Sequence, residues 1–230
     1  MKAMILAAGR GLRMGSLTDK LPKPLIPIAG QPVIAHQLLK LAKAGVREIV
    51  INVSYRAEQI MATLGKGDHY GVSIEYSYEP SALETGGGIV NALSLLGAEP
   101  FMVLSADIYT NYPLERLLNL NLGHTHAHLV LVDNPSYHEV GDFHLQQDTF
   151  LNLTQSPKLT FANLGVYHSR LFQDYKTAVF PLSKVLKQAI LQQKITGEYY
   201  TDQPPQQAIW FNLGSADELK KLEIHLKTIP

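Results

Sequence analysis

The residues best suited to chemistry lie near the start of the chain, where glycines and basic side chains follow a short apolar run. Gly9 comes directly after Ala8, and Gly11, Arg13 and Lys23 follow further along. The lysine lies between two prolines. Glycine lets backbone N–H groups face an anion, arginine offers a planar fork of donors, and lysine adds a compact charge. The segment could therefore hold several phosphate oxygens. By its residues alone, it could equally be a glycine turn with solvated cations.

Two common phosphate-binding motifs do not fit this segment. The dinucleotide fingerprint G-x-G-x-x-G requires glycine where Met14 stands, and the pattern G-x-x-x-x-G-K-[ST] has no match here. A phosphate site in this loop would need a different pattern.

A second glycine-rich segment, Leu83–Gly88, precedes a helical pattern that we expect to begin at Gly88. Three glycines in succession would leave backbone groups bare where a flat base or a ribose could lie. The competing interpretation is a flexible entry to the helix.

Asp107 follows the apolar run Phe101–Ser105. A carboxylate at the carboxyl end of a buried strand can bind Mg²⁺, which prefers oxygen ligands. The alternative is an aspartate that caps a turn.

The composition restricts the class of protein. The chain has 230 residues, 46% of them hydrophobic, and its 20 basic residues balance its 20 acidic ones. This composition is typical of a globular protein, and the neutral balance does not favour nucleic acid or an anionic membrane as a partner. Cysteine is absent, which excludes disulfides and thiol catalysis. With no run long enough for a membrane helix and no secretory pattern, we expect a cytoplasmic protein.

The elements needed to position these residues alternate along the chain. We predict strands at Ala3–Ala7, Glu48–Val53, Val72–Tyr78, Phe101–Ser105, Ala127–Val132, Asp142–Gln146, Leu159–His168 and Ala208–Leu213. We predict helices near Pro32–Ala44, Ala57–Leu64, Gly88–Leu96, Pro181–Gln193 and Ala216–Leu226. Such alternation favours βαβ units, and hence an α/β fold forming a single domain over residues 1–230. Residues from about 110 to 170 would extend the sheet and add a substrate-side elaboration.

In an open parallel sheet, ligands bind beyond the carboxyl ends of the strands. That rule selects three loops: Ala8–Lys23, Glu79–Gly88 and Ala106–Tyr109.

Taken together, Gly9-Arg10-Gly11-Leu12-Arg13 and Pro22-Lys23-Pro24 resemble the N-terminal signature of sugar-1-phosphate nucleotidylyltransferases. The resemblance implies a Rossmann-like three-layer α/β/α domain with a mostly parallel mixed sheet. It implies two substrates, a nucleoside triphosphate and a sugar 1-phosphate, with Mg²⁺ as cofactor. It also implies catalytic roles for Arg13, Lys23 and Asp107. The implied nucleotide-binding residues are Ala8, Gly9, Gly11, Arg13, Lys23, Glu79, Thr85, Gly86 and Gly87.

Within that family, the form Leu83-Glu84-Thr85-Gly86-Gly87-Gly88 is most similar to the bacterial N-acetylmuramate-1-phosphate uridylyltransferases of cell-wall recycling. This resemblance implies that UTP and N-acetylmuramate 1-phosphate are the substrates, and that Asp142, Asn163 and Glu198 contact the sugar. Many relatives supply a second metal-binding aspartate where this chain has Asn212, so Asn212 is expected to bind Mg²⁺ more weakly. The family's usual E-K-P lysine motif is absent, and Lys158 is a candidate substitute.

Other interpretations remain open at this point. The sugar could be a mannose, glucose or heptose phosphate paired with another nucleotide, or the chain could be a non-catalytic nucleotide sensor. His124, His126 and His128 alternate in a way that could bind a transition metal if they lay on one strand. Oligomeric state cannot be read from these residues.

Overall fold

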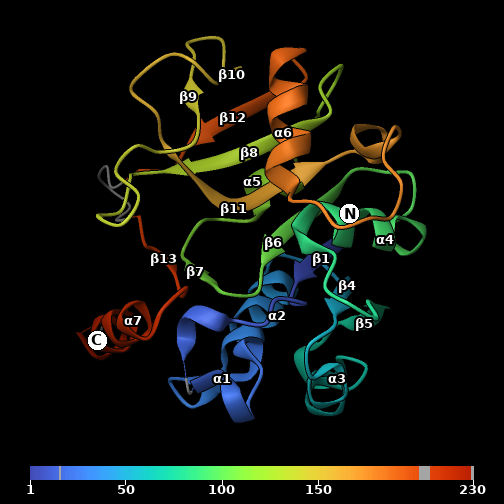
Figure 1. Cartoon of the computed structure of the whole chain (residues 1–230), viewed down its shortest axis with the longest axis vertical. Helices are drawn as coiled ribbons and strands as arrows, with labels where there is room; N and C mark the ends of the chain where they lie inside the picture. Colours follow the sequence, from blue (N-terminus) through green and yellow to red (C-terminus); the bar gives the residue numbers. More distant parts are fainter. Residues whose placement is uncertain (16, 202–207, 229–230) are drawn as a thin grey trace.

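A seven-stranded sheet forms the centre of the molecule (Figure 1). The computed structural model describes residues 1–15, 17–201 and 208–228. The strand order is β12-β8-β11-β6-β1-β4-β5, and only the pairings of β11 with β6 and β8 are antiparallel. The strands are β1 (Ala3–Leu6), β4 (Glu48–Val53), β5 (Ser73–Tyr78), β6 (Phe101–Ser105), β8 (Ala127–Val132), β11 (Thr160–Tyr167) and β12 (Ile195–Tyr199).

Helices cover both faces of this sheet. Neighbouring residues of a strand point to opposite faces, so Ile5 belongs to one core and Met4 to the other. The first core packs against α2 (Val33–Lys43), α3 (Ala57–Leu64) and α5 (Glu115–Leu118). The second packs against α4 (Glu84–Leu96) and α6 (Leu182–Leu191). The expected three-layer α/β/α fold with a mostly parallel sheet is confirmed.

Three small antiparallel pairs complete the strands: β7 (Ile108–Thr110) with β13 (Trp210–Asn212), β2 (Pro27–Ile28) with β3 (Gln31–Pro32), and β9 (His144–Leu145) with β10 (Leu151–Asn152). The remaining helices are α1 (Leu17–Lys20) and α7 (Ala216–Thr228). Four short 3₁₀ helices are η1 (Leu12–Met14), η2 (Lys23–Leu25), η3 (Asp68–Tyr70) and η4 (Ser169–Phe172).

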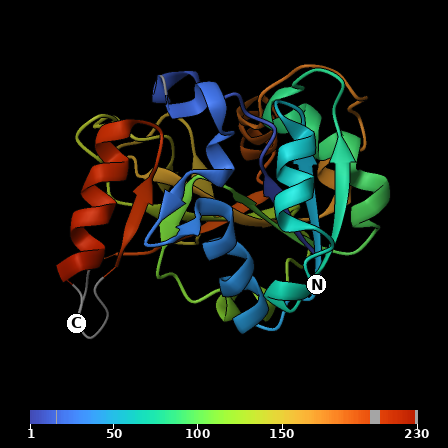
Figure 2. The same cartoon turned by 90° about the horizontal axis from the view of Figure 1, so that it is seen from below.

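The C-terminal helix α7 lies beside the N-terminal loops (Figure 2). Leu219 and Leu222 pack in a third apolar cluster with Met14 and Ile26. This cluster joins the two ends of the chain next to the first loop.

Some boundaries differ from the sequence prediction. Helix α4 begins at Glu84 rather than Gly88, so Gly86–Gly88 lie inside the helix. The strand predicted at Asp142–Gln146 is reduced to the two residues of β9, while β12 and β7 were not predicted. Strand β7 is short and β12 contains a glycine, and both are paired with strands far away in the sequence. The two-residue strands β2, β3 and β10 were also not predicted.

In the part of the chain that the structure describes, no helix has the length and apolar character that crossing a membrane requires.

Candidate active site

The first loop is shaped by a left-handed glycine. Gly11 has φ +69°, and a Cβ there would lie 3.1 Å from both Lys23 Cβ and Thr18 Cγ2. Only glycine suits both the backbone conformation and the tight packing. The turn leads into η1, which carries Arg13, and a Cβ on Gly214 would lie 3.2 Å from an Arg13 guanidinium nitrogen. The Arg13 guanidinium therefore lies against the loop that follows β13.

Lys23 and Asp107 form an ion pair across the strand ends. Lys23 lies in η2, which follows Pro22 and is largely buried. Asp107 lies in the turn between β6 and β7. The lysine ammonium in this position neutralises the charge of the aspartate.

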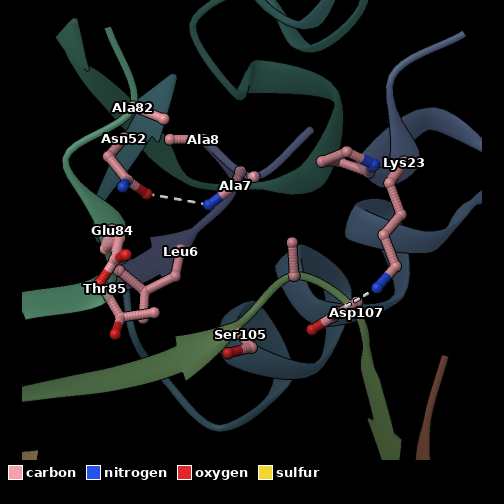
Figure 3. A pocket seen from close by; sticks show the side chains of 13 residues that line it. Leu6, Ala7, Ala8, Lys23, Asn52, Ala82, Glu84, Thr85, Ser105 and Asp107 are labelled. Carbon is pink, nitrogen blue, oxygen red and sulfur yellow. Dashed lines mark hydrogen bonds and ion pairs between the residues drawn. The ribbon is translucent and has the colours of Figure 1, made fainter. Parts of the chain in front are cut away.

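A cavity of about 180 Å³, here called the inner cavity, lies beyond the ends of β1 and β6 (Figure 3). These two strands flank the point where the strand order reverses, which is where open α/β sheets bind ligands. Lys23 and Asp107 lie at one end of it, and Asn52, Glu84 and Thr85 lie at the other. Its wall also contains Leu6, Ala7, Ala8, Gly9, Pro24, Ala82, Ser105 and Ala106.

Glu79 lies behind this wall. Its Oε1 accepts from Asn52 Nδ2 at 2.8 Å and its Oε2 accepts from the Leu83 N–H at 2.9 Å, while Asn52 Oδ1 accepts from the Ala7 N–H at 2.8 Å. Residue Glu79 is 1% exposed. It is not among the described residues that line the inner cavity. Glu79 thus connects the loop after β5 to the loop after β1, and its predicted contact with a nucleotide stays a prediction.

The glycines of α4 serve close packing. A Cβ on Gly87 would lie 1.9 Å from the Ala178 carbonyl oxygen, and the N–H groups of Gly86 and Gly87 donate to the Phe180 carbonyl at 3.0 and 3.1 Å. The N–H groups of Gly86 and Gly87 are therefore not bare, and the predicted contact of these two residues with a nucleotide stays a prediction. Thr85 does lie on the cavity wall, and its Oγ1 accepts from the Leu182 N–H at 2.8 Å.

A second cavity, here called the outer cavity, has Arg13, Lys23 and Asp107 on its wall together. Its volume is about 440 Å³, and the other wall residues are Gly9, Arg10, Gly11, Leu12 and Gly214. Residues of the first loop and of the turn after β6 thus face one cleft. Basic side chains beside glycine backbone are suited to a polyphosphate.

Asn212 meets Asp107 through strand pairing. Asn212 is paired with Ile108 in the β13–β7 ladder, and the Leu213 N–H donates to the Asp107 carbonyl at 2.8 Å. The Asn212 Oδ1 atom is buried and has no hydrogen-bond partner among the described residues. An orphaned amide oxygen next to a carboxylate-bearing turn is a donor set that suits a hard cation such as Mg²⁺.

The side cavity, of about 410 Å³, lies between the sheet and the start of α6. Asp142 and Asn163, both predicted to contact a sugar, lie on its wall with Arg13, Thr85 and Asn212. Asn163 has φ +55° and lies where β11 shifts register between Phe161 and Gly165. This irregularity interrupts the β11–β8 ladder beside the cavity. The other wall residues are Leu6, Val103, Ser105, Tyr137, His138, Phe143, Thr160, Phe161, Tyr167, Pro181, Leu182, Ser183, Leu186 and Trp210.

Glu198 does not join this group. It lies on β12, where it accepts from the Tyr112 hydroxyl and lies 3.5 Å from Arg116 and 3.7 Å from His128. Burial would raise the pKa of the Glu198 carboxyl, but His128 and Tyr112 outweigh that effect and hold the pKa below its usual value. Glu198 is absent from the described walls of the three cavities, so a sugar contact would require a change in this arrangement.

Two further sequence candidates also lie elsewhere. Lys158 is not among the described residues lining the side cavity, and its carbonyl accepts from Asn134. His128 is buried on β8, with Nδ1 2.9 Å from Thr196 Oγ1.

Sequence reasoning missed several wall residues. Asn52 could have been noticed as a polar residue inside the apolar strand β4. Tyr137 and His138 carried no comparable signal, because tertiary contacts alone bring them to the side cavity.

Comparison with known proteins agrees with this geometry. Residues 2–145 match the family model described as nucleotidyl transferase. The N-acetylmuramate alpha-1-phosphate uridylyltransferase of Neisseria meningitidis serogroup B is 40% identical over 97% of both chains. The mannose-1-phosphate guanyltransferase of Candida albicans is 40% identical over 61% of this chain and 40% of its own length.

Solved structures show the same fold. HddC from Yersinia pseudotuberculosis, crystallised with GMP-PN, has a TM-score of 0.78 at 21% identity and covers 98% of this chain, with 99% of its own length matched. The first loop, its basic side chains and the turn that carries Asp107 share one cleft, and the family model matches more than half of the chain, so this chain belongs to the nucleotidyl transferase family.

Proposed function

We propose that the protein transfers the uridylyl group of UTP to N-acetylmuramate 1-phosphate, forming a UDP-sugar and pyrophosphate in cell-wall recycling. The observation that supports this proposal most directly is that Arg13, Lys23 and Asp107 face one cleft. The choice of substrates is supported by the Neisseria meningitidis relative, which matches at 40% identity over 97% of both chains.

In the reaction, a phosphate oxygen of the sugar 1-phosphate bonds to the α-phosphorus of UTP. The bond between the α-phosphorus and the oxygen that bridges the α- and β-phosphates breaks. The bonding electrons leave with pyrophosphate. Because the attacking phosphate is already ionised at neutral pH, the step needs no general base. What it needs is alignment of two mutually repelling anions and neutralisation of the leaving group.

Each of these requirements has a candidate residue. Gly9 and Gly11 bring backbone close to the triphosphate, while Arg13 and Lys23 offset the charge that builds on the β- and γ-phosphates. Arg13 lies on the walls of both the outer and the side cavity, so one guanidinium can face both reactants. The inner cavity would take the nucleoside and the side cavity the sugar.

Asp107 and Asn212 would hold the metal. Mg²⁺, when bound, would polarise the phosphate oxygens and hold the two reactants together. The orphaned Asn212 Oδ1 and the Asp107 carboxylate fit this ion through the chemistry of their oxygen donors.

The substrate proposal is tested by a panel of UTP, GTP, dTTP and ATP against sugar 1-phosphates, with pyrophosphate release as the readout. The highest kcat/KM is expected for UTP with N-acetylmuramate 1-phosphate. A preference for GTP with mannose 1-phosphate would favour the activity named for the fungal relatives. Nucleotide binding without any turnover would favour a sensor.

The role of Asp107 is tested by Asp107→Ala. We expect kcat to fall by about 10²–10³-fold, the scale of losing one group that stabilises the transition state. Far-UV circular dichroism checks that the fold is retained. Turnover near the wild-type level at saturating Mg²⁺ would contradict the assignment.

A further inference from the structure

The side cavity has few basic side chains for the anionic sugar 1-phosphate that the proposed function assigns to it. Among its described wall residues, the basic side chains are Arg13 and His138. Arg13 also lies on the wall of the outer cavity beside Lys23, where phosphate charge has to be neutralised. His138 is therefore the basic group left for a second anionic substituent.

His138 is held by an acidic partner. Its Nε2 lies 3.1 Å from Asp142 Oδ1, and the second oxygen of Asp142 accepts from the Phe161 N–H at 2.8 Å. One carboxylate oxygen of Asp142 thus contacts the imidazole and the other accepts from the backbone, so Asp142 can orient His138. The His138 side chain is 40% exposed, so a ligand can reach it.

The segment that carries His138 is anchored at several points. Asn134 Nδ2 donates to the carbonyls of Glu139 and Lys158, each at 2.9 Å, and its Oδ1 accepts from Thr160 Oγ1 at 2.8 Å. Gly141 has φ +67°, and a Cβ there would lie 2.7 Å from Asn134 Oδ1. The imidazole is consequently positioned before any ligand arrives, which lowers the entropic cost of binding.

We propose that His138, oriented by Asp142, binds a carboxylate on the sugar and so selects sugar 1-phosphates that carry one. The inference rests on the proposed function, because N-acetylmuramate differs from N-acetylglucosamine by a lactyl ether that ends in a carboxylate. The Nε2 atom faces Asp142, so Nδ1 is the ring nitrogen left to face the substrate carboxylate. An imidazole donates from both nitrogens when it carries two protons.

The test compares two sugars that differ only in the lactyl group. With UTP, kcat/KM is measured for N-acetylmuramate 1-phosphate and N-acetylglucosamine 1-phosphate, in the wild type, in His138→Ala and in the matched control His144→Ala. His144 lies on β9 with its Nδ1 2.7 Å from the Pro157 carbonyl, and it is not among the described residues of the side cavity. Where N-acetylglucosamine 1-phosphate is not turned over, its inhibition constant replaces kcat/KM.

We expect His138→Ala to lower kcat/KM for N-acetylmuramate 1-phosphate about 10- to 100-fold, mainly through KM, the scale of losing a charged hydrogen bond. The ratio of the two sugars should fall by a similar factor, and His144→Ala should leave it unchanged. Equal losses for both sugars, or no loss, would overturn the inference while leaving the proposed function intact. A wild type that does not turn over N-acetylmuramate 1-phosphate would overturn the proposed function, and the inference with it.

Discussion

At the scale of residues, Lys23 and Asp107 neutralise each other across the cleft. Under the proposed function, an incoming triphosphate would compete with Asp107 for the lysine, and a divalent ion would compete with Lys23 for the aspartate. Such an exchange of partners would keep both charges compensated with and without substrate.

Asn212 leads to a prediction about metal affinity. In Asn212→Asp, a carboxylate replaces a neutral amide oxygen, and the Mg²⁺ concentration that gives half-maximal activity should fall by about tenfold. The same change buries a charge, so without Mg²⁺ the melting temperature should also fall and recover when the ion is added. A Mg²⁺ titration of activity and of thermal melting checks both effects. An unchanged Mg²⁺ requirement would argue that position 212 is not a ligand.

At the scale of elements, α4 and β7 position the cavity walls. Helix α4 approaches the segment before α6 so closely that Gly87 cannot carry a side chain without a shift of the backbone. Strand β7 is paired with β13 on one edge, while Gln37 and Lys40 of α2 donate to its carbonyls at Ile108 and Thr110. These contacts fix the position of β7, and hence of Asp107, which directly precedes it.

Gly87→Ala tests the packing of α4. Alanine is the better helix former by about 1 kcal/mol. However, its Cβ would lie 1.9 Å from the Ala178 carbonyl oxygen, so the backbone has to move. We expect the free energy of unfolding to fall by about 1–3 kcal/mol. Denaturant titration measures it, with the exposed Ser94→Ala on the same helix as the control. A stabilised Gly87→Ala would mean that the contact relaxes easily.

Lys40 leads to a prediction about pH. Burial lowers the pKa of the Lys40 ammonium from 10.5 to about 8, partly opposed by Glu115. Below pH 8 the amine is protonated in both the folded and the unfolded state, so the cost of burying its charge is present in full. Between pH 8 and 10.5 the unfolded state binds more protons, so stability rises with pH.

The measurement is the free energy of unfolding of the wild type minus that of Lys40→Met. This difference should shift in favour of the wild type as pH rises from 8 to 10.5. A flat or opposite trend would show that the Lys40 pKa is not lowered by folding.

At the scale of the whole molecule, the cleft exists because distant segments meet at one edge of the sheet. The loop after β1, the start of α4, the turn after β6 and the loop after β13 all contribute wall residues. A ligand bound there contacts segments from both ends of the chain, and it should stabilise the fold as a unit.

The stabilisation of the fold by a bound ligand can be measured by thermal melting with UTP and Mg²⁺. A ligand at 100 times its Kd adds about 2.7 kcal/mol, which corresponds to about 5–10 °C for a chain of this length. Lys23→Ala should lose most of this shift, whereas the exposed surface variant Lys187→Ala should keep it. An equal shift in Lys23→Ala would place the triphosphate elsewhere.

Much of the fold could be predicted from local patterns. Apolar runs such as Phe101–Ser105 and amphipathic stretches such as Ala57–Leu64 determine their own element type, because burial requires that periodicity. Gly9, Gly11, Arg13, Lys23 and Asp107 were selected from the sequence and line one cavity, while their roles toward a ligand stay predictions. Element types could be predicted because a short segment contains the whole signal.

The remaining features were decided by tertiary structure. The start of α4 depends on what its glycines pack against, β12 on pairing with β8, and the engagement of Asp142 on His138 and Phe161. Glu198 was assigned to the sugar site by resemblance, yet its partners Tyr112, Arg116 and His128 come from elements separated widely in the sequence. The sequence determined which groups are present and which elements carry them. Only the folded chain decided which groups are already satisfied by one another and which remain free to meet a ligand, because that depends on contacts between segments that no local pattern records.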